Sequence, residues 1–283
     1  MRLNGITISG GELRSMKDMT CCIDSEDMKS LEWASQKLEH PSLAARISNL
    51  AGTPIDMAIH LLPRAAYKKI EKAAHRAISK ALKVAVSSLR NNEERRSHDS
   101  TYLGMAAGSG AVGGLFGLYG LPLDLPISTT IMLRSIAEIA RSEGEDLSSE
   151  ETQLACLEVF ALGGHSESDD AAETGYYGMR LALGWMVTHA AHHIARKGLG
   201  NGGAPILVSL ISVISSRFGA VVSQKVLAQA VPLVGAAGGA AINLLFMSHF
   251  QDMARGHFLI RRLERKYGKE LIKTTYEDLC AQT

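Results

Sequence analysis

The stretch GGLFGLYGLPLDLPISTTIMLRSIAEIARSEGEDLSSEETQLACLEVFALGG, residues 113–164, decides the fold. It joins a glycine-rich helix, through a Gly/Pro turn, to two apolar helices that carry few charges. The charges among apolar neighbours include Asp124, Arg134, Glu138 and Glu158. The stretch predicts an all-α protein in which charged side chains are placed among apolar ones.

The turn before the first of these helices contains Asp124, followed two residues later by Pro126. Asp is strongly preferred as a helix N-cap, and Pro is tolerated in the first turn, so we expect Asp124 to cap a helix over residues 127–142. On this helix Arg134 and Glu138 are one turn apart. They form either a solvated pair or an inward pair on a helix that is packed all round.

The second helix begins after an acidic turn. Ser148 with Glu151 three residues later is a capping-box pattern, which predicts a helix over residues 149–162. Glu158 stands alone among apolar residues of this helix. Because lone charges are rarely buried without a partner, Glu158 is the strongest candidate for an inward, partnered carboxylate. We expect Arg134 to be its partner.

Two segments without charged side chains lie on either side of this stretch. One runs between Asp99 and Asp124 and the other over residues 226–248, and both are rich in glycine and alanine. Small residues at four-residue spacing allow helices to approach closely. We expect these two helices to pack together as the centre of a single multi-helix domain. The first is also about as long as a membrane span, so bilayer insertion after rearrangement is the alternative.

Residues 63–90 predict a long amphipathic helix. Its apolar half is rich in alanine, and its other half is basic, opposed only by Glu71. The basic residues are Lys68, Lys69, Lys72, Arg76, Lys80 and Lys83. A helix of this kind can lie on anionic headgroups. The alternative is a solvated face that covers the core, because the apolar half lacks the bulky residues of a strong membrane anchor.

The remaining pattern is also helical. Further helices are expected over residues 24–40, 41–50, 54–62, 171–196, 204–216, 218–230 and 232–268. The segment 204–216 is rich in β-branched residues, which leaves a strand open there. His189 and His193 have the spacing of two helix-borne metal ligands, but the H-E-x-x-H pattern is absent, so a surface histidine cluster is expected.

The order of these motifs resembles the EcsC family. The resemblance is carried by the DLP triplet, by T-x-x-x-R-S-I-A-x-I-A, by the G-E-D turn and by C-L-E-V-F-A-L-G-G, and again by VPLVGAAGGAAINLLFMSHFQDMARGHFLIRRLERKYG at residues 231–268. The resemblance implies an all-α architecture and a polar core, but no established reaction. The implied core residues are Asp124, Arg134, Glu138, Glu158, Asn243, His249, Asp252, His257 and Arg261.

Composition narrows the class of protein. The chain has 283 residues, with 30 basic and 29 acidic side chains, and this balance argues against general nucleic-acid binding. The four cysteines show no C-x-x-C spacing, and the N-terminus lacks the apolar region of a secretory signal. We expect a bacterial, cytoplasmic protein with a flexible segment at residues 1–23 and one helical domain over residues 24–283.

Three functions follow from these observations. The first is peripheral attachment to an anionic membrane surface or a membrane protein, because the operon that gives the EcsC family its name also encodes an ABC transporter. The second is a helical enzyme with a divalent metal ion held by Glu138, Glu158, His249 and Asp252. The third is a membrane-inserting protein. No cofactor is predicted under the first function, and close glycine packing is compatible with a homo-oligomer.

Overall fold

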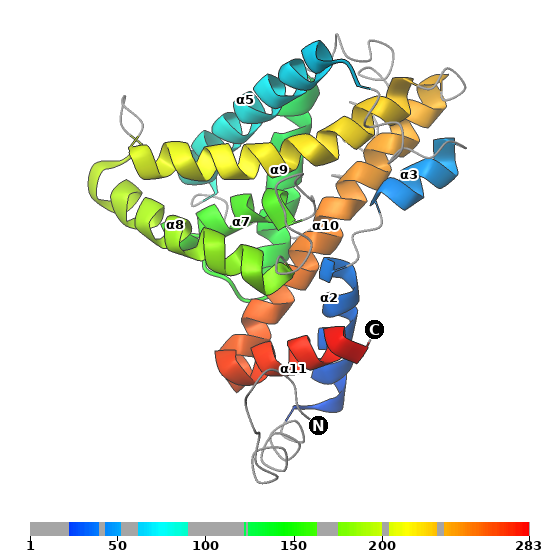
Figure 1. Ribbon diagram of the computed structural model, residues 1–283. Coiled ribbons are helices and arrows are strands. Elements are labelled where there is room, and N and C mark those ends of the chain that lie inside the picture. Colours follow the sequence, from blue (N-terminus) through cyan, green and yellow to red (C-terminus); the bar gives the residue numbers. More distant parts are fainter. Residues whose placement is uncertain are drawn as a thin grey trace, which may run out of the picture.

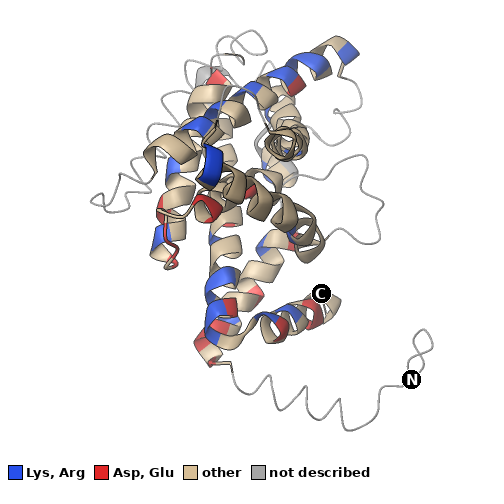
Figure 2. Ribbon diagram, turned by 90° about the vertical axis from the view of Figure 1, so that its left-hand side faces the viewer, with Lys and Arg blue, Asp and Glu red and all other residues tan. Residues whose placement is uncertain are grey.

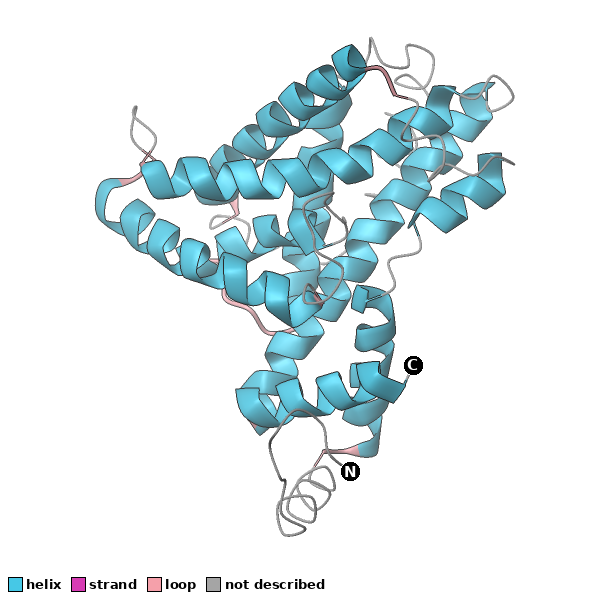
Figure 3. Cartoon of the chain, in the orientation of Figure 1, coloured by secondary structure: helices cyan, strands magenta, loops and turns pink. Residues whose placement is uncertain are grey.

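The computed structural model describes residues 23–39, 43–51, 62–89, 122, 124–162, 175–199, 204–230 and 235–282. These residues form helices and short connections and contain no strand, which confirms the all-α fold (Figures 1 and 3). One helix covers residues 124–142. The others are α2 (Ser25–Glu39), α3 (Leu43–Ala51), α5 (Arg64–Ser88), α7 (Glu150–Leu162), α8 (Tyr176–Lys197), α9 (Pro205–Ala230), α10 (Gly235–Tyr267) and α11 (Lys269–Gln282).

Helix α7 is the centre of the domain. It contacts α5, α8, α9 and α10, and every residue from Thr152 to Leu162 is buried. A helix that is apolar on all sides is stable in water only when other helices cover every side. Two of the helices that cover α7 are α8 and α9, which follow it in the chain and both pack on it (Figure 1).

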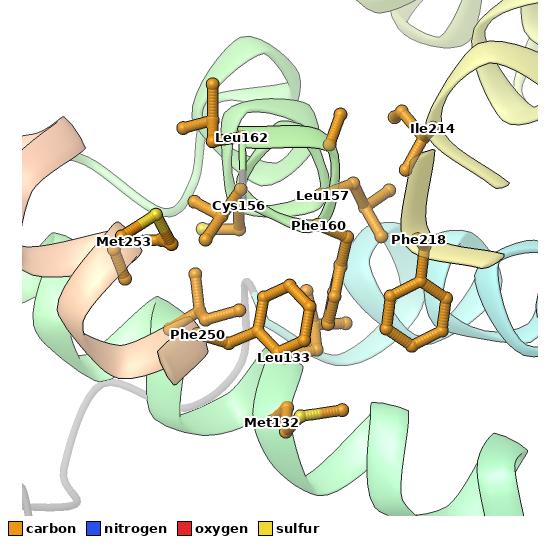
Figure 4. Close-up of a cluster of buried hydrophobic side chains, with 14 of the residues drawn as sticks. Met132, Leu133, Cys156, Leu157, Phe160, Leu162, Ile214, Phe218, Phe250 and Met253 are labelled. Atoms are coloured by element: carbon orange, nitrogen blue, oxygen red, sulfur yellow. The ribbon is translucent and has the colours of Figure 1, made fainter. Parts of the chain in front are cut away.

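The core beside α7 is aromatic. The Phe160 ring lies 5.1 Å from the Phe218 ring of α9 and 5.2 Å from the Phe250 ring of α10, centroid to centroid. Figure 4 shows these three rings gathered between the helices, with Met132 and Leu133 from the helix at residues 124–142 beneath them. Such edge-on and tilted ring pairs add about 0.5–1.5 kcal/mol each beyond the area that they bury.

Helix α5 has the two faces that its sequence predicts. The apolar stripe is buried against α9 and α7 from Ala66 to Ala85, and the six predicted cations are all exposed. The stripe is rich in alanine, so α5 and α9 can lie close together. One example is Gly219 of α9, where an added Cβ would lie 3.8 Å from the Ala74 Cβ.

Helix α9 is the most apolar element. Within the described parts of the chain it is the one helix long and apolar enough to cross a membrane, over Pro205–Ala228, with a mean hydropathy of 1.9. However, 56% of that window is buried, and α9 contacts α3, α5, α7, α8 and α10. A core helix of a water-exposed domain has the same composition, so this finding alone does not place α9 in a bilayer.

Two predicted details of these helices are wrong. Residues 204–216 and 218–230 form one continuous helix and no strand, because neither glycine nor proline interrupts the junction at Ser216 and Arg217. Ser148 does not cap α7: its hydroxyl donates to Asp146 at 2.8 Å, and the carbonyl of Ser149 accepts the first bond of the helix instead.

The C-terminal helices close the lower end of the domain. Helix α10 is continuous over 33 residues and ends at Tyr267; the next residue, Gly268, has a φ of 96°, which is left-handed and suits glycine. Helix α11 follows directly and was not predicted as a separate element. Helices α2 and α11 both pack on α10 and on each other (Figure 1).

Some predictions fall outside the described residues. These are the segment at residues 1–22, the helix at 54–61 and the glycine-rich segment at 99–121. The predicted pairing of the two glycine-rich helices therefore stays a prediction.

The packing of α2 on α10 gives a stability prediction at Gly256. A Cβ there would lie 2.9 Å from Leu38 Cγ, closer than real contacts, whereas the buried Gly219 has ordinary contact distances. Alanine gains about 1 kcal/mol of helix propensity at either site, but overpacking costs about 1–3 kcal/mol. We expect Gly256→Ala to lower the free energy of unfolding by about 1 kcal/mol and Gly219→Ala to raise it, measured by urea unfolding followed by circular dichroism. If Gly256→Ala destabilises a Leu38→Ala protein as much as the parent, the contact with Leu38 is not the cause.

Candidate functional site

A buried carboxylate on α7 is influenced electrostatically by two arginines from other helices. Glu158 is 3% exposed and interacts electrostatically with Arg180 on α8 and Arg261 on α10. Burial raises its pKa to about 7, and the two arginines oppose this shift only in part. The predicted inward carboxylate is therefore present, but its charged neighbours are Arg180 and Arg261. The predicted partner Arg134 is wrong, since the largest opposite charges at Glu158 come from α8 and α10.

Each arginine is held by another carboxylate. Arg180 donates two hydrogen bonds to Glu264, at 2.7 and 2.6 Å, and Arg261 donates two to Glu145, at 2.9 Å each. The Tyr177 hydroxyl also donates to Glu264 at 3.1 Å. Such two-pronged pairs fix the plane of the guanidinium as well as its position. A guanidinium has five N–H donors, so these bonds leave donors of both arginines for other acceptors.

The imidazole of His257 lies deeper in the same cluster. Its Nδ1 shares a hydrogen bond of 3.0 Å with the Tyr176 hydroxyl, and its Nε2 has no partner among the described residues. Burial, followed by the charges of Arg180 and Arg261, lowers the pKa of His257 well below its ordinary value. The ring is therefore neutral at physiological pH and connects α8 to α10 by its hydrogen bond.

A cleft of about 480 Å³ opens beside this cluster, between α7, α8, α10 and α11. Glu158, Arg180, Arg261 and Glu264 line its polar wall, and Leu181, Gly184 and Trp185 of α8 line an apolar wall. The volume lies within the range of small-molecule sites, and a group with a strongly shifted pKa lies on its wall. This cleft is the candidate functional site.

A second buried pair lies apart from the cleft. Lys225 of α9 is fully buried, and its Nζ donates to Asp124 at 3.1 Å and lies 4.9 Å from the Phe246 ring centroid. The predicted capping role of Asp124 is wrong, because Asp124 is itself helical and an N-cap residue lies just before the helical residues. Its carboxylate instead neutralises a lysine that would otherwise lie unpaired in the core.

The other predicted core residues are dispersed. Asp252 lies on the far side of α10, within 3.4 Å of Lys37 and Arg255. Glu138, Asn243 and His249 are buried and Arg134 is half-buried. Among the described residues, no three His, Cys, Asp or Glu side chains gather as metal ligands. The alternative metal set of Glu138, Glu158, His249 and Asp252 is therefore not brought together.

The basic end of α10 is engaged in ion pairs. Arg262 contacts Asp27 and Glu143, Arg265 contacts Glu145, and Lys266 contacts Asp27 at 2.6 Å. Figure 2 shows the two charge signs intermixed where α10 meets α11. The acidic turn after residue 142 and the start of α2 therefore supply carboxylates to the basic residues that end α10.

Sequence reasoning missed Arg180, Glu264, Glu145, Tyr176 and Lys225. For two of these residues the sequence contains a pattern from which a buried, paired charge could have been predicted. Lys225 is one of only two charged residues in the apolar helix α9, with Arg217, and Glu264 is the one acid among the basic residues that end α10. Both patterns are typical of a partnered buried group. The partners themselves depend on the offset between helices, which the sequence does not contain.

The pKa of Glu158 predicts a pH dependence of stability. Between pH 4.5, its ordinary pKa, and about 7 the folded chain keeps a proton that the unfolded chain releases. The free energy of unfolding therefore falls over this range, by roughly 3 kcal/mol, and stays lower above it. Glu158→Gln keeps the shape without the titration. We expect it to be stabilising relative to the parent by roughly 3 kcal/mol more at pH 8 than at pH 5, by urea unfolding. An equal difference at both pH values would show that Glu158 titrates normally.

The Lys225–Asp124 pair gives a second stability prediction. Asp124→Ala leaves a fully buried ammonium without its carboxylate, which should lower the free energy of unfolding by about 3 kcal/mol. Adding Lys225→Met removes the orphaned charge and should restore most of that loss. A double variant as unstable as the single one, in the same urea assay, would contradict the pairing.

Comparison with known proteins gives one match. The EcsC protein family model matches residues 25–263, most of the chain and all the helices around the cleft except α11. Searches of curated proteins and of solved structures returned no match.

Proposed function

The chain belongs to the EcsC protein family, and we propose that it is a membrane-peripheral, lipid-interacting protein that docks on an anionic surface through α5. One observation carries this proposal. The basic residues Lys68, Lys69, Lys72, Arg76, Lys80 and Lys83 are all exposed on α5, while the opposite face of the same helix is buried in the domain.

The charge of α5 is largely of one sign. Glu71 is the one acidic residue in the helix, and Figure 2 shows blue residues recurring along its length with a single red one. Each Lys or Arg near an anionic membrane contributes about 1 kcal/mol of attraction. The apolar face of α5 is occupied by α9 and α7, so the helix does not need to leave the domain in order to bind.

This arrangement favours surface attachment over insertion. A helix that inserts at the interface buries its apolar face among the acyl chains, but in α5 that face forms part of the protein core. The attraction is therefore mainly electrostatic and sensitive to salt. The same surface could also bind the acidic cytoplasmic face of a membrane protein. An assay with vesicles of pure lipid tests binding to lipid alone.

The test is co-sedimentation with phosphatidylcholine vesicles that contain phosphatidylserine. We expect binding at low ionic strength and release at about 1 M salt, where the Debye length is about 3 Å. The variant Lys72→Gln/Arg76→Gln/Lys80→Gln removes three exposed cations and should weaken binding roughly 100-fold, at about 1 kcal/mol each.

The matched control removes three cations elsewhere. Lys29, Arg196 and Lys197 are exposed on α2 and α8, away from α5, and Lys29→Gln/Arg196→Gln/Lys197→Gln should bind like the parent. Equal losses in both triple variants would mean that net charge, and not α5, drives binding. Release of trapped dye from the vesicles would favour insertion over peripheral attachment.

A further inference from the structure

The cleft beside Glu158 has an apolar wall that is open to water. Leu181 and Trp185, one turn apart on α8, are 69% and 61% exposed, the two most exposed large apolar side chains in the described chain. Gly184 lies next to them in the lining, and an added Cβ there would meet nothing within 4 Å. Glycine within a helix costs about 1 kcal/mol relative to alanine, and here its missing side chain leaves the cleft open.

The polar part of the lining offers hydrogen-bond groups of both kinds. Arg180 and Arg261 are held in place by Glu264 and Glu145 and have donors beyond those bonds. Glu158 belongs to the same lining, and its Oε1 is buried and has no hydrogen-bond partner among the described residues. A buried polar atom without a partner is unusual in a folded protein. This wall therefore matches a ligand that has several acceptors and at least one donor.

Two lysine side chains line the mouth of the cleft. Lys269 and Lys273 of α11 are one turn apart and line it, with Glu270 between them in sequence and Glu151 on α7. The acceptor-rich end of a ligand can therefore reach both guanidinium and ammonium groups, while its chain lies on Leu181 and Trp185.

We propose that this cleft binds the headgroup and first chain atoms of an anionic lipid whose phosphate ester carries free hydroxyls, a phosphoglycerol. The phosphate oxygens accept from Arg180 and Lys273, a glycerol hydroxyl donates to Glu158, and the acyl chain packs on Trp185. The proposal rests on the proposed function, because a peripheral protein meets such headgroups at the membrane surface, but it concerns a different face of the molecule from α5.

Trp185 is a built-in reporter for this site. The chain has two tryptophans, Trp33 and Trp185, so Trp33→Phe leaves only the one in the cleft. Titration of this protein with dihexanoyl-phosphatidylglycerol, below its micelle concentration, should shift the Trp185 emission to the blue and saturate. Dihexanoyl-phosphatidylmethanol has the same charge and chains but no hydroxyl, and should bind about tenfold more weakly. Equal affinity for the two lipids, or no shift, would overturn the proposal.

Two variants locate the binding. Gly184→Phe fills the cleft and should weaken phosphatidylglycerol binding at least tenfold, whereas Ala182→Phe, an exposed position of α8 outside the lining, should leave it unchanged. Glu158→Leu removes the acceptor without adding bulk, and should bring the two lipids to within about twofold of each other. Retained binding in Gly184→Phe, or retained preference in Glu158→Leu, would place the ligand elsewhere.

Two further experiments distinguish a lipid ligand from a soluble one, and the cleft site from the docking surface on α5. Glycerophosphoglycerol has the same phosphodiester headgroup without acyl chains, and if it binds as tightly as phosphatidylglycerol the cleft takes a soluble phosphate ester and not a lipid. The α5 variant Lys72→Gln/Arg76→Gln/Lys80→Gln should lose vesicle binding and keep the Trp185 response. Vesicle binding without a Trp185 response overturns the cleft site alone, and the reverse overturns the docking surface alone.

Discussion

Helix α7 has no side that faces water over Thr152–Leu162, and the rest of the structure depends on this constraint. Among the labelled helices, those that contact it come from both sides of it in the chain: α5 before it, and α8, α9 and α10 after it. A fully surrounded helix can carry a carboxylate only where a neighbour supplies positive charge or a hydrogen bond. At Glu158 this positive charge comes from Arg180 of α8 and Arg261 of α10.

The buried polar groups divide into two kinds. Pairs such as Arg180–Glu264 and Lys225–Asp124 satisfy each other and fix the offset between helices that are far apart in sequence. Oxygen Oε1 of Glu158 and nitrogen Nε2 of His257 lie within the same region without described partners. A core built only for stability would use apolar side chains in place of such groups, because buried ion pairs stabilise a fold little compared with hydrophobic packing. The combination of fixed and unsatisfied groups next to a cleft is the reason to assign a ligand there.

The predictable features are those that depend on a single helix. The exposed and buried faces of α5 follow from the 3.6-residue period and are correct to the residue, and the inward position of Glu158 follows from its apolar neighbours. The partner of Glu158 could not be predicted, because Arg134 and Arg180 are equally plausible until the rotation of each helix is known. Ser148 shows the same limit locally: the capping-box pattern is present, but Asp146 two residues earlier competes for its hydroxyl. The sequence of α8 does not divide into one apolar and one polar face, because the helix covers α7 on one side and lines the cleft with another.

The docking of α2 on α10 has a consequence for synthesis. The apolar stripe of α2, with Leu31, Ala34 and Leu38, is covered by a helix that begins about two hundred residues later, and Lys266 contacts Asp27 across 239 positions. At the usual translation rate of about 5–20 residues per second, this stripe leaves the ribosome about 10–40 s before its partner. During that interval a chaperone or another nascent chain can bind it, so α2 waits for its native contacts although it is made early.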